Sequence, residues 1–327
     1  MSLVAVTGAA GHLGANLVRA LIDEGREVRC LVRTDLRAIE GLGVERAVGD
    51  LEDVDSLRRA FAGAQTVFHL AANISIAGGM GGLVERANVG GVKNVLDACR
   101  AAGVKPLVHF SSVRALAEPA AGVALDEDQP LASGRALSPY ERSKVEGERL
   151  VLEAVAAGLD AVICTPTAAL GPHDYKPSRA GMALVDLWRG RLPALLGGGF
   201  DWVDARDVAK GALAAEKKGT AGRRYLLCGA WRSVAQLAEL VHQNGGRPPP
   251  RIVVPLALAA AVAPLGLAGS RLLGSTPVFT PEAIRSLRGM RQIHPRRSIA
   301  ELGWAPRPIE VTVADTLAWF RNYGSLA

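Results

Sequence analysis

The sequence predicts an α/β fold in which a doubly wound parallel sheet is followed by a smaller C-terminal part. Two observations support this prediction. A glycine-rich loop joins an apolar run to a helical pattern in "VAVTGAAGHLGANLVRAL", residues 4–21. Short apolar runs then alternate with segments of helical periodicity as far as residue 170, where the alternation breaks up.

The elements before residue 170 follow a repeating strand–helix order. Short apolar runs separated by helices are typical of a parallel sheet that is buried on both faces. Right-handed crossovers place the connecting helices on each side of it. The expected strands are "LVAVTG", "EVRCLVR", "AVGDL", "TVFHLAA", "PLVHFSS" and "DAVICTPT", and the expected helices are residues 12–24, "VDSLRRAFAG", "VGGVKNVLDACRAAG" and "YERSKVEGERLVLEAVAAG".

Residues 171–327 are expected to form the smaller α/β part, packed on the first because few long linkers occur. Within "GGGFDWVDARDVAKGALAAEKK", a strand and a helix are expected to return toward the first part around residues 200–217. The other expected elements are helices in "MALVDLWRGRL" and "SVAQLAELVHQNG", a strand in "RRYLLCG", and two helices in "SIAELGWAPRPIEVTVADTLAWFRNYG".

Composition excludes several classes of protein. The net charge is +6, but the basic residues are mostly arginines interleaved with acidic ones, and no nucleic-acid-binding motif accompanies them. Val4 to Thr7 already has the pattern of a strand, so no signal peptide is expected. The cysteines lie far apart without CxxC spacing, which predicts no metal site and a reducing, cytoplasmic location. They are Cys30, Cys99, Cys164 and Cys228.

One apolar segment, residues 252–269, is nearly long enough to span a bilayer. Pro255 and Pro264 interrupt it, and alanines fill much of it. A buried helix, or a helix that covers an apolar substrate, is therefore expected in place of a membrane span. Peripheral membrane contact is the alternative.

Glycines at positions 8, 11 and 14 fit a turn that binds a dinucleotide pyrophosphate. Glycine allows a positive φ and leaves no Cβ to block the phosphates. The free N–H groups and the dipole of the following helix favour an anion at that place. Because this loop follows a strand and opens a helix, the spacing predicts a Rossmann dinucleotide-binding domain over residues 1–170.

The end of the second strand indicates which dinucleotide is bound. An acidic residue there reads a ribose 2′-hydroxyl, whereas arginine accommodates a 2′-phosphate. Arg33 stands at this end with Arg37 four residues on, and Asp35 lies beyond the strand. Guanidinium pairs well with phosphate, so NADP(H) is predicted over NAD(H). The alternative is that Arg33 is a solvated cation.

The stretch "SPYERSK" places Tyr140 and Lys144 on one helical face. A tyrosine with an unperturbed pKa of about 10 is a poor acid at neutral pH. A neighbouring ammonium lowers that pKa, so Lys144 is expected to tune Tyr140 for acid–base catalysis. The strand end "LVHFSSVRA" offers a third hydroxyl, from Ser111 or Ser112, to hold the reacting oxygen.

The GxxGxxG spacing together with "YERSK" resembles the extended branch of the short-chain dehydrogenase/reductase superfamily. Along the whole chain the resemblance is to a subgroup of dihydroflavonol 4-reductase-like proteins that includes bacterial hopanoid-associated members. It implies that Ser112, Tyr140 and Lys144 are catalytic and that helices 89–102 and 140–157 pair in a homodimer. The implied cofactor contacts are Thr7, Gly8, Gly11, His12, Leu13, Gly14, Arg33, Asp50, Leu51, Ala71, Ala72, Asn88, Tyr140, Lys144, Pro166 and Thr167.

The predicted activity is NADP(H)-dependent reduction of a ketone or aldehyde on a largely apolar small molecule, bound by the C-terminal part. The alternative is a nucleotide-sugar epimerase or dehydratase with bound NAD(P), and a cofactor sensor is more distant because Tyr140 and Lys144 are both present. A late arginine cluster could hold a diphosphate or form a solvated face: Arg285, Arg288, Arg291, Arg296 and Arg297. Candidate substrate contacts are Ile74, Arg114, His173 and Tyr175, with Ile76, Met80, Leu170 and Trp202 as further wall residues.

Overall fold

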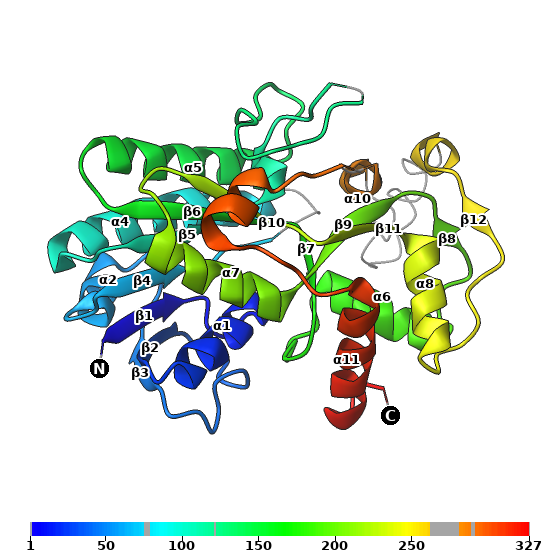
Figure 1. Cartoon of the computed structure of the whole chain (residues 1–327), viewed down its shortest axis with the longest axis horizontal. Coiled ribbons are helices and arrows are strands. Elements are labelled where there is room, and N and C mark those ends of the chain that lie inside the picture. The colour runs from blue at the N-terminus through cyan, green and yellow to red at the C-terminus, as the bar shows by residue number, and fades with distance from the viewer. Residues whose placement is uncertain (1, 75–78, 121, 262–280, 289–291, 327) are drawn as a thin grey trace.

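A seven-stranded parallel sheet forms the centre of the molecule (Figure 1). The computed structural model describes residues 2–74, 79–120, 122–261, 281–288 and 292–326. The strand order is β10-β6-β5-β4-β1-β2-β3, so the order reverses between β1 and β4. The strands are β1 (Leu3–Thr7), β2 (Glu27–Val32), β3 (Glu45–Val48), β4 (Thr66–His69), β5 (Leu107–Phe110), β6 (Ala161–Pro166) and β10 (Arg224–Leu227).

Helices cover both faces of this sheet. On one face, α1 (His12–Asp23) and α7 (Ala205–Lys218) enclose a core built around Leu17, Phe68 and Tyr225. On the other face lie α2 (Val54–Phe61), α4 (Gly91–Ala102) and α5 (Pro139–Ala156), over a second core that includes Phe61 and Ile163. The short turns on the way to α4 are Met80–Gly82, Leu83–Glu85 and the π-helical Arg86–Gly90.

The smaller part has its own sheet and its own core. Its three strands are β7 (Ala168–Leu170), β9 (Gly199–Asp204) and β11 (Ala230–Ser233), with β9 in the middle. Three helices pack around a core of leucines, Val313 and Trp202. These helices are α6 (Arg179–Trp188), α8 (Val234–Gln243) and α11 (Ile309–Asn322), and the remaining elements are β8 (Leu195–Leu196), β12 (Val253–Val254), α10 (Pro281–Leu287) and the π-helical turn Ser298–Leu302.

The predicted fold class is confirmed. The start of one strand and the sheet that another strand joins differ from the expectation. The third strand begins at Glu45, two residues before the run chosen from the sequence. Of the strand and helix expected to return around residues 200–217, the helix α7 does pack on the large sheet, but the strand is β9, which belongs to the small sheet. The strand that returns to the large sheet is β10, which pairs with β6 in parallel. Three of the four residues of β10 are buried. A run of four residues does not indicate which of the two sheets the strand joins.

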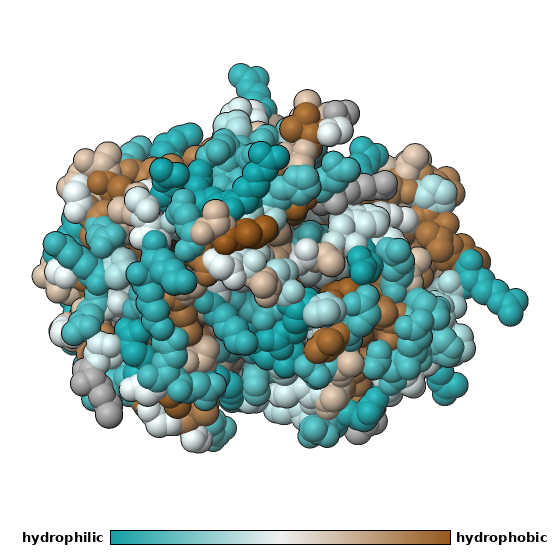
Figure 2. All heavy atoms as spheres, viewed as in Figure 1, coloured by the Kyte–Doolittle hydropathy of each residue, from teal (hydrophilic) through white to brown (hydrophobic). Residues whose placement is uncertain are grey.

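The apolar segment 252–269 is not a buried helix in its described half. Residues 253–254 form β12, a helix begins at residue 256, and Leu258 is 57% exposed. Figure 2 shows hydrophobic residues gathering over β12 and this helix. Residues 262–269 lie outside the described part of the chain. Among the described helices, none has both the length and the apolar character that a bilayer crossing requires.

The four cysteines are free and buried, as expected from their apolar surroundings. Burial raises the pKa of the Cys30 thiol to about 12 and shifts the other three in the same direction. Within the described residues, His, Cys, Asp and Glu side chains form no group that could hold a metal ion.

Candidate active site

Close approach of the backbone requires glycine at one position of the loop between β1 and α1 and at one position of the first turns of α1. Gly8 has a φ of +76°, and a Cβ there would lie 2.6 Å from the backbone nitrogen of Ala71. A Cβ on Gly14 would lie 2.1 Å from the carbonyl oxygen of Gly8. These glycines let the first turn of α1 pack directly against the loop.

The N-terminus of α1 is suited to an anion. Gly11 is its N-cap residue, no side chain caps the helix, and its first turn contains no acidic residue. The uncapped N–H groups and the helix dipole therefore favour a negative charge. The loop also lies where the strand order reverses, between β1 and β4, which is where open α/β sheets bind dinucleotides. The residues present fit the pyrophosphate of a nicotinamide dinucleotide.

Thr7 and His12 use their side chains inside the protein. Thr7 is fully buried, and its hydroxyl lies 2.7 Å from Nδ1 of His69 and accepts a hydrogen bond from the N–H of Ala71. Nε2 of His12 lies 3.1 Å from the carbonyl oxygen of Gly171. Both side chains are therefore engaged in contacts within the protein.

Arg33 follows the last residue of β2 and extends into solvent. Its side chain is 75% exposed, and it lies 3.4 Å from the carboxylate of Asp50. Arg37 is instead held by Asp35 through hydrogen bonds of 2.9 and 2.7 Å. Of the two arginines, Arg33 therefore keeps the more accessible guanidinium for a ribose 2′-phosphate.

Asn88 joins the segment after β4 to α5. It lies in the π-helical turn Arg86–Gly90, a kind of turn that is frequent at functional sites. Its side-chain oxygen accepts from the N–H of Asn73 at 2.7 Å. Its side-chain nitrogen donates to the carbonyl oxygen of Asn73 and to the hydroxyl of Ser143. Asn88 thus fixes the segment that carries Ala71 and places it beside α5.

The remaining predicted cofactor positions divide into buried and accessible ones. Leu51 is buried against α4, and Pro166 is the buried last residue of β6. The hydroxyl of Thr167 donates to Asp201 at 2.7 Å, and burial raises the pKa of that carboxyl. The positions that keep part of their surface exposed are Leu13, Ala71 and Ala72.

Ser112 and Tyr140 meet beyond the carboxyl end of β5. Ser112 caps the turn Val113–Ala115, and its hydroxyl accepts from the N–H of Arg114 at 3.2 Å. The side chains of Ser112 and Tyr140 lie close enough that Ser112 acts to lower the pKa of the phenol. Ser111 is buried, and its hydroxyl donates to Glu148. The structure therefore brings Ser112, the serine favoured by the family resemblance, to the phenol.

The start of α5 is defined by its sequence. Ser138 is the N-cap, Pro139 occupies the first turn, and Glu141 completes a capping box with Ser138. The box satisfies N–H groups that would otherwise lack partners at the helix end. Tyr140, between Pro139 and Glu141, therefore lies in a first turn whose backbone is fixed by the capping box.

The pKa of Tyr140 differs from the expectation. Burial raises it, while the hydrogen bond with Ser112 and the positive charge of Arg114 act to lower it. Lys144 instead donates from Nζ to the carbonyl oxygen of Phe110 at 2.9 Å. The expectation that Lys144 lowers the pKa of Tyr140 is therefore wrong in this structure. Spacing of four residues puts both side chains on one helical face, but it does not set where the long lysine chain ends.

Arg114, predicted as a substrate contact, is paired with a carboxylate. Its guanidinium donates to Glu141, and both side chains are largely buried. Glu141 also accepts from the N–H of Ser138, and these contacts hold the pKa of its carboxyl below the usual value although burial opposes them. The pair links the turn after Ser112 to the turn that carries Tyr140. This link was not apparent from the sequence, because 27 residues separate Arg114 from Glu141.

His173 and Tyr175 pack against residues of α1 and α11. The hydroxyl of Tyr175 accepts from Arg19 at 2.8 Å, and its ring meets Trp319 edge-on at 5.2 Å. The His173 ring stacks on Tyr175 at 6.1 Å, and burial lowers the pKa of His173 to about 4. In this structure the side chains of His173 and Tyr175 therefore pack against other residues of the protein. That either residue contacts a substrate stays a prediction. Ile74, in contrast, is 66% exposed after β4.

Two of the late arginines are held by contacts within the protein. Arg285 donates to the carbonyl oxygen of Ala136 in the loop before α5, whereas Arg297 pairs with Asp128 at the edge of the sheet. Trp202 is buried in the core of the small part, and Leu170 likewise. Ile76 and Arg291 lie outside the described residues.

Comparisons with known proteins agree with this fold. A sequence model of the "NAD dependent epimerase/dehydratase family" matches residues 4–228, which ends just after β10. The chain is 38% identical over 325 residues to "Sterol demethylase protein B" of Methylococcus capsulatus, covering 98% of this chain and 99% of that protein. It is 33% identical over 327 residues to "Putative dihydroflavonol 4-reductase" of Synechocystis, covering 98% and 94%. The crystal structure of gox2253 matches with a TM-score of 0.88 and 33% identity, with both chains fully covered.

We expect Gly14→Ala to weaken dinucleotide binding and to destabilise the fold by about 1–3 kcal/mol, since the new Cβ would overlap Gly8 and Ala9. Thermal unfolding and NADPH fluorescence titration measure the two effects. Gly43→Ala is the matched control, because a Cβ there meets nothing within 4 Å. Equal affinity in both variants would contradict the close packing.

Proposed function

Because this chain belongs to the NAD-dependent epimerase/dehydratase family, within the extended short-chain dehydrogenases/reductases, we propose that it is an NADP(H)-dependent carbonyl reductase. The observation that carries the proposal is the meeting of Ser112 with Tyr140 beyond the end of β5. The uncapped glycine loop at the start of α1 lies on the same edge of the sheet.

The proposed chemistry assigns one task to each side chain. A bound nicotinamide would exchange a hydride with the carbonyl carbon. Ser112 donates a hydrogen bond to the substrate oxygen and orients it toward Tyr140. Tyr140 gives its phenolic proton to that oxygen in reduction and takes it back in oxidation. Because burial raises the pKa of Tyr140, the phenol is held in its protonated form, which is the form that reduction needs.

Lys144 supplies the positive charge of the site. Its Nζ lies beyond the end of β5, bonded to the carbonyl oxygen of Phe110. Burial lowers the pKa of Lys144 to about 8, and Glu148 opposes that shift. The ammonium is therefore present below this pH and lost above it, so reductase activity should decline as the pH rises through about 8.

The preference for NADP(H) is proposed on the position of Arg33. An exposed guanidinium directly after β2 suits bidentate pairing with a 2′-phosphate. Asp50, 3.4 Å away, would share Arg33 with that phosphate. Asp35, which could otherwise accept from a 2′-hydroxyl, is occupied by Arg37.

The proposed substrate is a largely apolar molecule with a ketone or aldehyde group. The names of the two relatives, a sterol demethylase protein and a dihydroflavonol 4-reductase, point to such compounds. Exposed Ile74 directly follows the segment after β4 that Asn88 holds beside α5, and exposed Met80 begins the turn Met80–Gly82. Apolar side chains at that place suit a substrate of low polarity.

A nucleotide-sugar epimerase or dehydratase with bound NAD(P) is the second candidate. The family description includes such enzymes, and Arg285 reaches the loop before Tyr140, where a diphosphate could pair with it. A panel of carbonyl compounds and UDP-sugars distinguishes the two. Net NADPH consumption with ketones, without interconversion of UDP-sugars, supports the reductase.

Tyr140→Phe should lower kcat for carbonyl reduction by about 10²- to 10⁴-fold, because the proton donor is removed. NADPH binding should persist, since the ring remains. Absorbance of NADPH follows the first quantity, and fluorescence titration follows the second. Turnover equal to that of the unmodified protein would remove Tyr140 from the mechanism.

Arg33→Gln should weaken NADPH by roughly ten- to hundredfold while changing NADH little, because only NADPH carries the 2′-phosphate. Arg58→Gln serves as the control, because Arg58 is also exposed but lies on α2, away from the end of β2. The ratio of the two dissociation constants is the measured quantity. Equal weakening of both cofactors would refute the role of Arg33.

Arg114→Met separates positioning from substrate binding. If Arg114 acts through Glu141 and Tyr140, kcat falls roughly tenfold with little change in KM. If Arg114 binds an acidic substrate group, KM rises instead. Steady-state kinetics with a neutral ketone and with a ketone that carries a carboxylate, compared with Arg142→Met on the exposed face of α5, provide the measurement.

A further inference from the structure

A buried polar network connects α5 to the edge of the sheet. Glu148 is completely buried and lies one helical turn beyond Lys144. One carboxylate oxygen accepts from the hydroxyl of Ser111. The other accepts from Arg224 on β10, from Nε at 2.8 Å and from a terminal nitrogen at 2.5 Å. Both oxygens are therefore engaged, which fixes the carboxylate in place.

Lys144 and Glu148 contact consecutive residues of the same strand end. Lys144 donates to the carbonyl oxygen of Phe110, and Glu148 accepts from Ser111. The next residue is Ser112, whose side chain lies close to Tyr140 and acts on its pKa. Glu148 thus belongs to the row of contacts that sets the place of the reacting groups, although it touches none of them itself.

The other titratable groups that face Lys144 provide no second negative charge. His69 and His109 lie on the same face of the sheet as Thr7, at paired positions of β4 and β5. Burial lowers the pKa of His69 to about 3 and also lowers that of His109, so both rings are neutral. Tyr140 is held protonated by burial. Among these neighbours, Glu148 is the one that favours the ammonium form of Lys144.

We propose that Glu148 is a positioning residue of the reaction, whose buried carboxylate keeps Lys144 charged and directed at the end of β5. This proposal rests on the proposed function, in which Lys144 supplies the positive charge of the active site. Arg224 and Ser111 hold the carboxylate, and its charge compensates the cost of burying an ammonium beside two neutral imidazoles.

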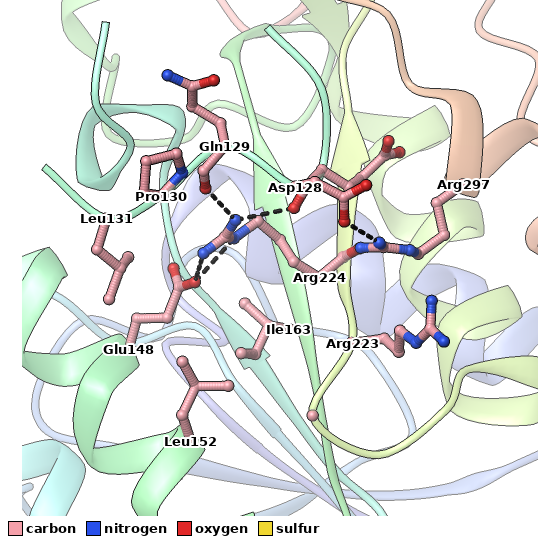
Figure 3. A pocket seen from close by; sticks show the side chains of 12 residues that line it. Asp128, Gln129, Pro130, Leu131, Glu148, Leu152, Ile163, Arg223, Arg224 and Arg297 are labelled. Atoms are coloured by element: carbon pink, nitrogen blue, oxygen red, sulfur yellow. Dashed lines mark hydrogen bonds and ion pairs between the residues drawn. The ribbon is translucent and has the colours of Figure 1, made fainter. Parts of the chain in front are cut away.

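The outer side of the network opens into a cavity of about 490 Å³ (Figure 3). Arg224 fills its inner end and donates to the carbonyl oxygens of Glu127 and Gln129 at 2.9 and 2.8 Å. Arg297 pairs with Asp128 farther out. The guanidinium of Arg224 therefore makes four hydrogen bonds, two to Glu148 and two to backbone carbonyl oxygens, which hold it against the Glu148 carboxylate.

The chain offers a direct test because it contains only seven lysines. Lysine labelled with carbon-13 at Cε gives few NMR signals, and the loss of one in Lys144→Met assigns Lys144. We expect Glu148→Gln to lower the pH midpoint of the Lys144 signal by about one unit, because burial is then unopposed and Arg224 repels the ammonium. Glu153→Gln, at an exposed position of the same helix, should leave it unchanged. An unchanged or raised midpoint in Glu148→Gln overturns the proposal.

A second variant allows for misfolding of the first. Glu148→Leu with Arg224→Met replaces the buried pair by apolar side chains, an exchange that proteins often tolerate. The Lys144 midpoint should again fall below that of the unmodified protein, because the nearer of the two charges was the carboxylate. A midpoint at or above the original value counts against Glu148.

Kinetics then separate this inference from the proposed function. In Glu148→Gln the decline of kcat with rising pH should move to lower pH, with activity regained on acidification and KM for NADPH little changed. Uniform loss of activity at every pH would indicate a structural role and overturn the proposal. If the unmodified protein reduces no carbonyl compound, the proposed function fails, and the NMR midpoints still decide the effect of Glu148 on Lys144.

Discussion

The junction between the end of β5 and the first turns of α5 is the constraint on which the candidate chemistry depends. Four residues from Phe110 to Arg114 contact four residues of one helix: Lys144, Glu148, Tyr140 and Glu141. Each contact alone is a single polar interaction. Because they occur in a row on two rigid elements, they hold a phenol, a hydroxyl and an ammonium in fixed relation.

The polar groups at this junction lie between a parallel sheet and a helix, where charges are costly. The structure meets that cost by alternating sign, from Lys144 to Glu148 to Arg224, and by keeping His69 and His109 neutral. A cation can then persist at a buried position. The same arrangement accounts for a lysine whose pKa lies near the physiological range.

The sequence predicted what depends on local pattern. The strand–helix alternation, the glycine loop and the Tyr140–Lys144 spacing each follow from a few neighbouring residues. Contacts between distant residues could not be predicted from it. Arg114 pairs with Glu141, 27 positions away, and β10 joins β6 only after the chain has formed β7 and β9 of the small sheet. His173 and Tyr175 lie in a loop whose position depends on Trp319, near the end of the chain, so their packing could not be foreseen.

The seventh strand of the large sheet follows the first two strands of the small one in the chain. The polypeptide leaves the large sheet after β6, builds β7 and β9, and comes back through α7 and β10 before it departs again. The two parts are therefore interleaved rather than consecutive. A chimera that exchanged whole halves at residue 170 would strip the first half of an edge strand and of the helix beside α1, so new specificity has to be grafted as separate inserts on an intact scaffold.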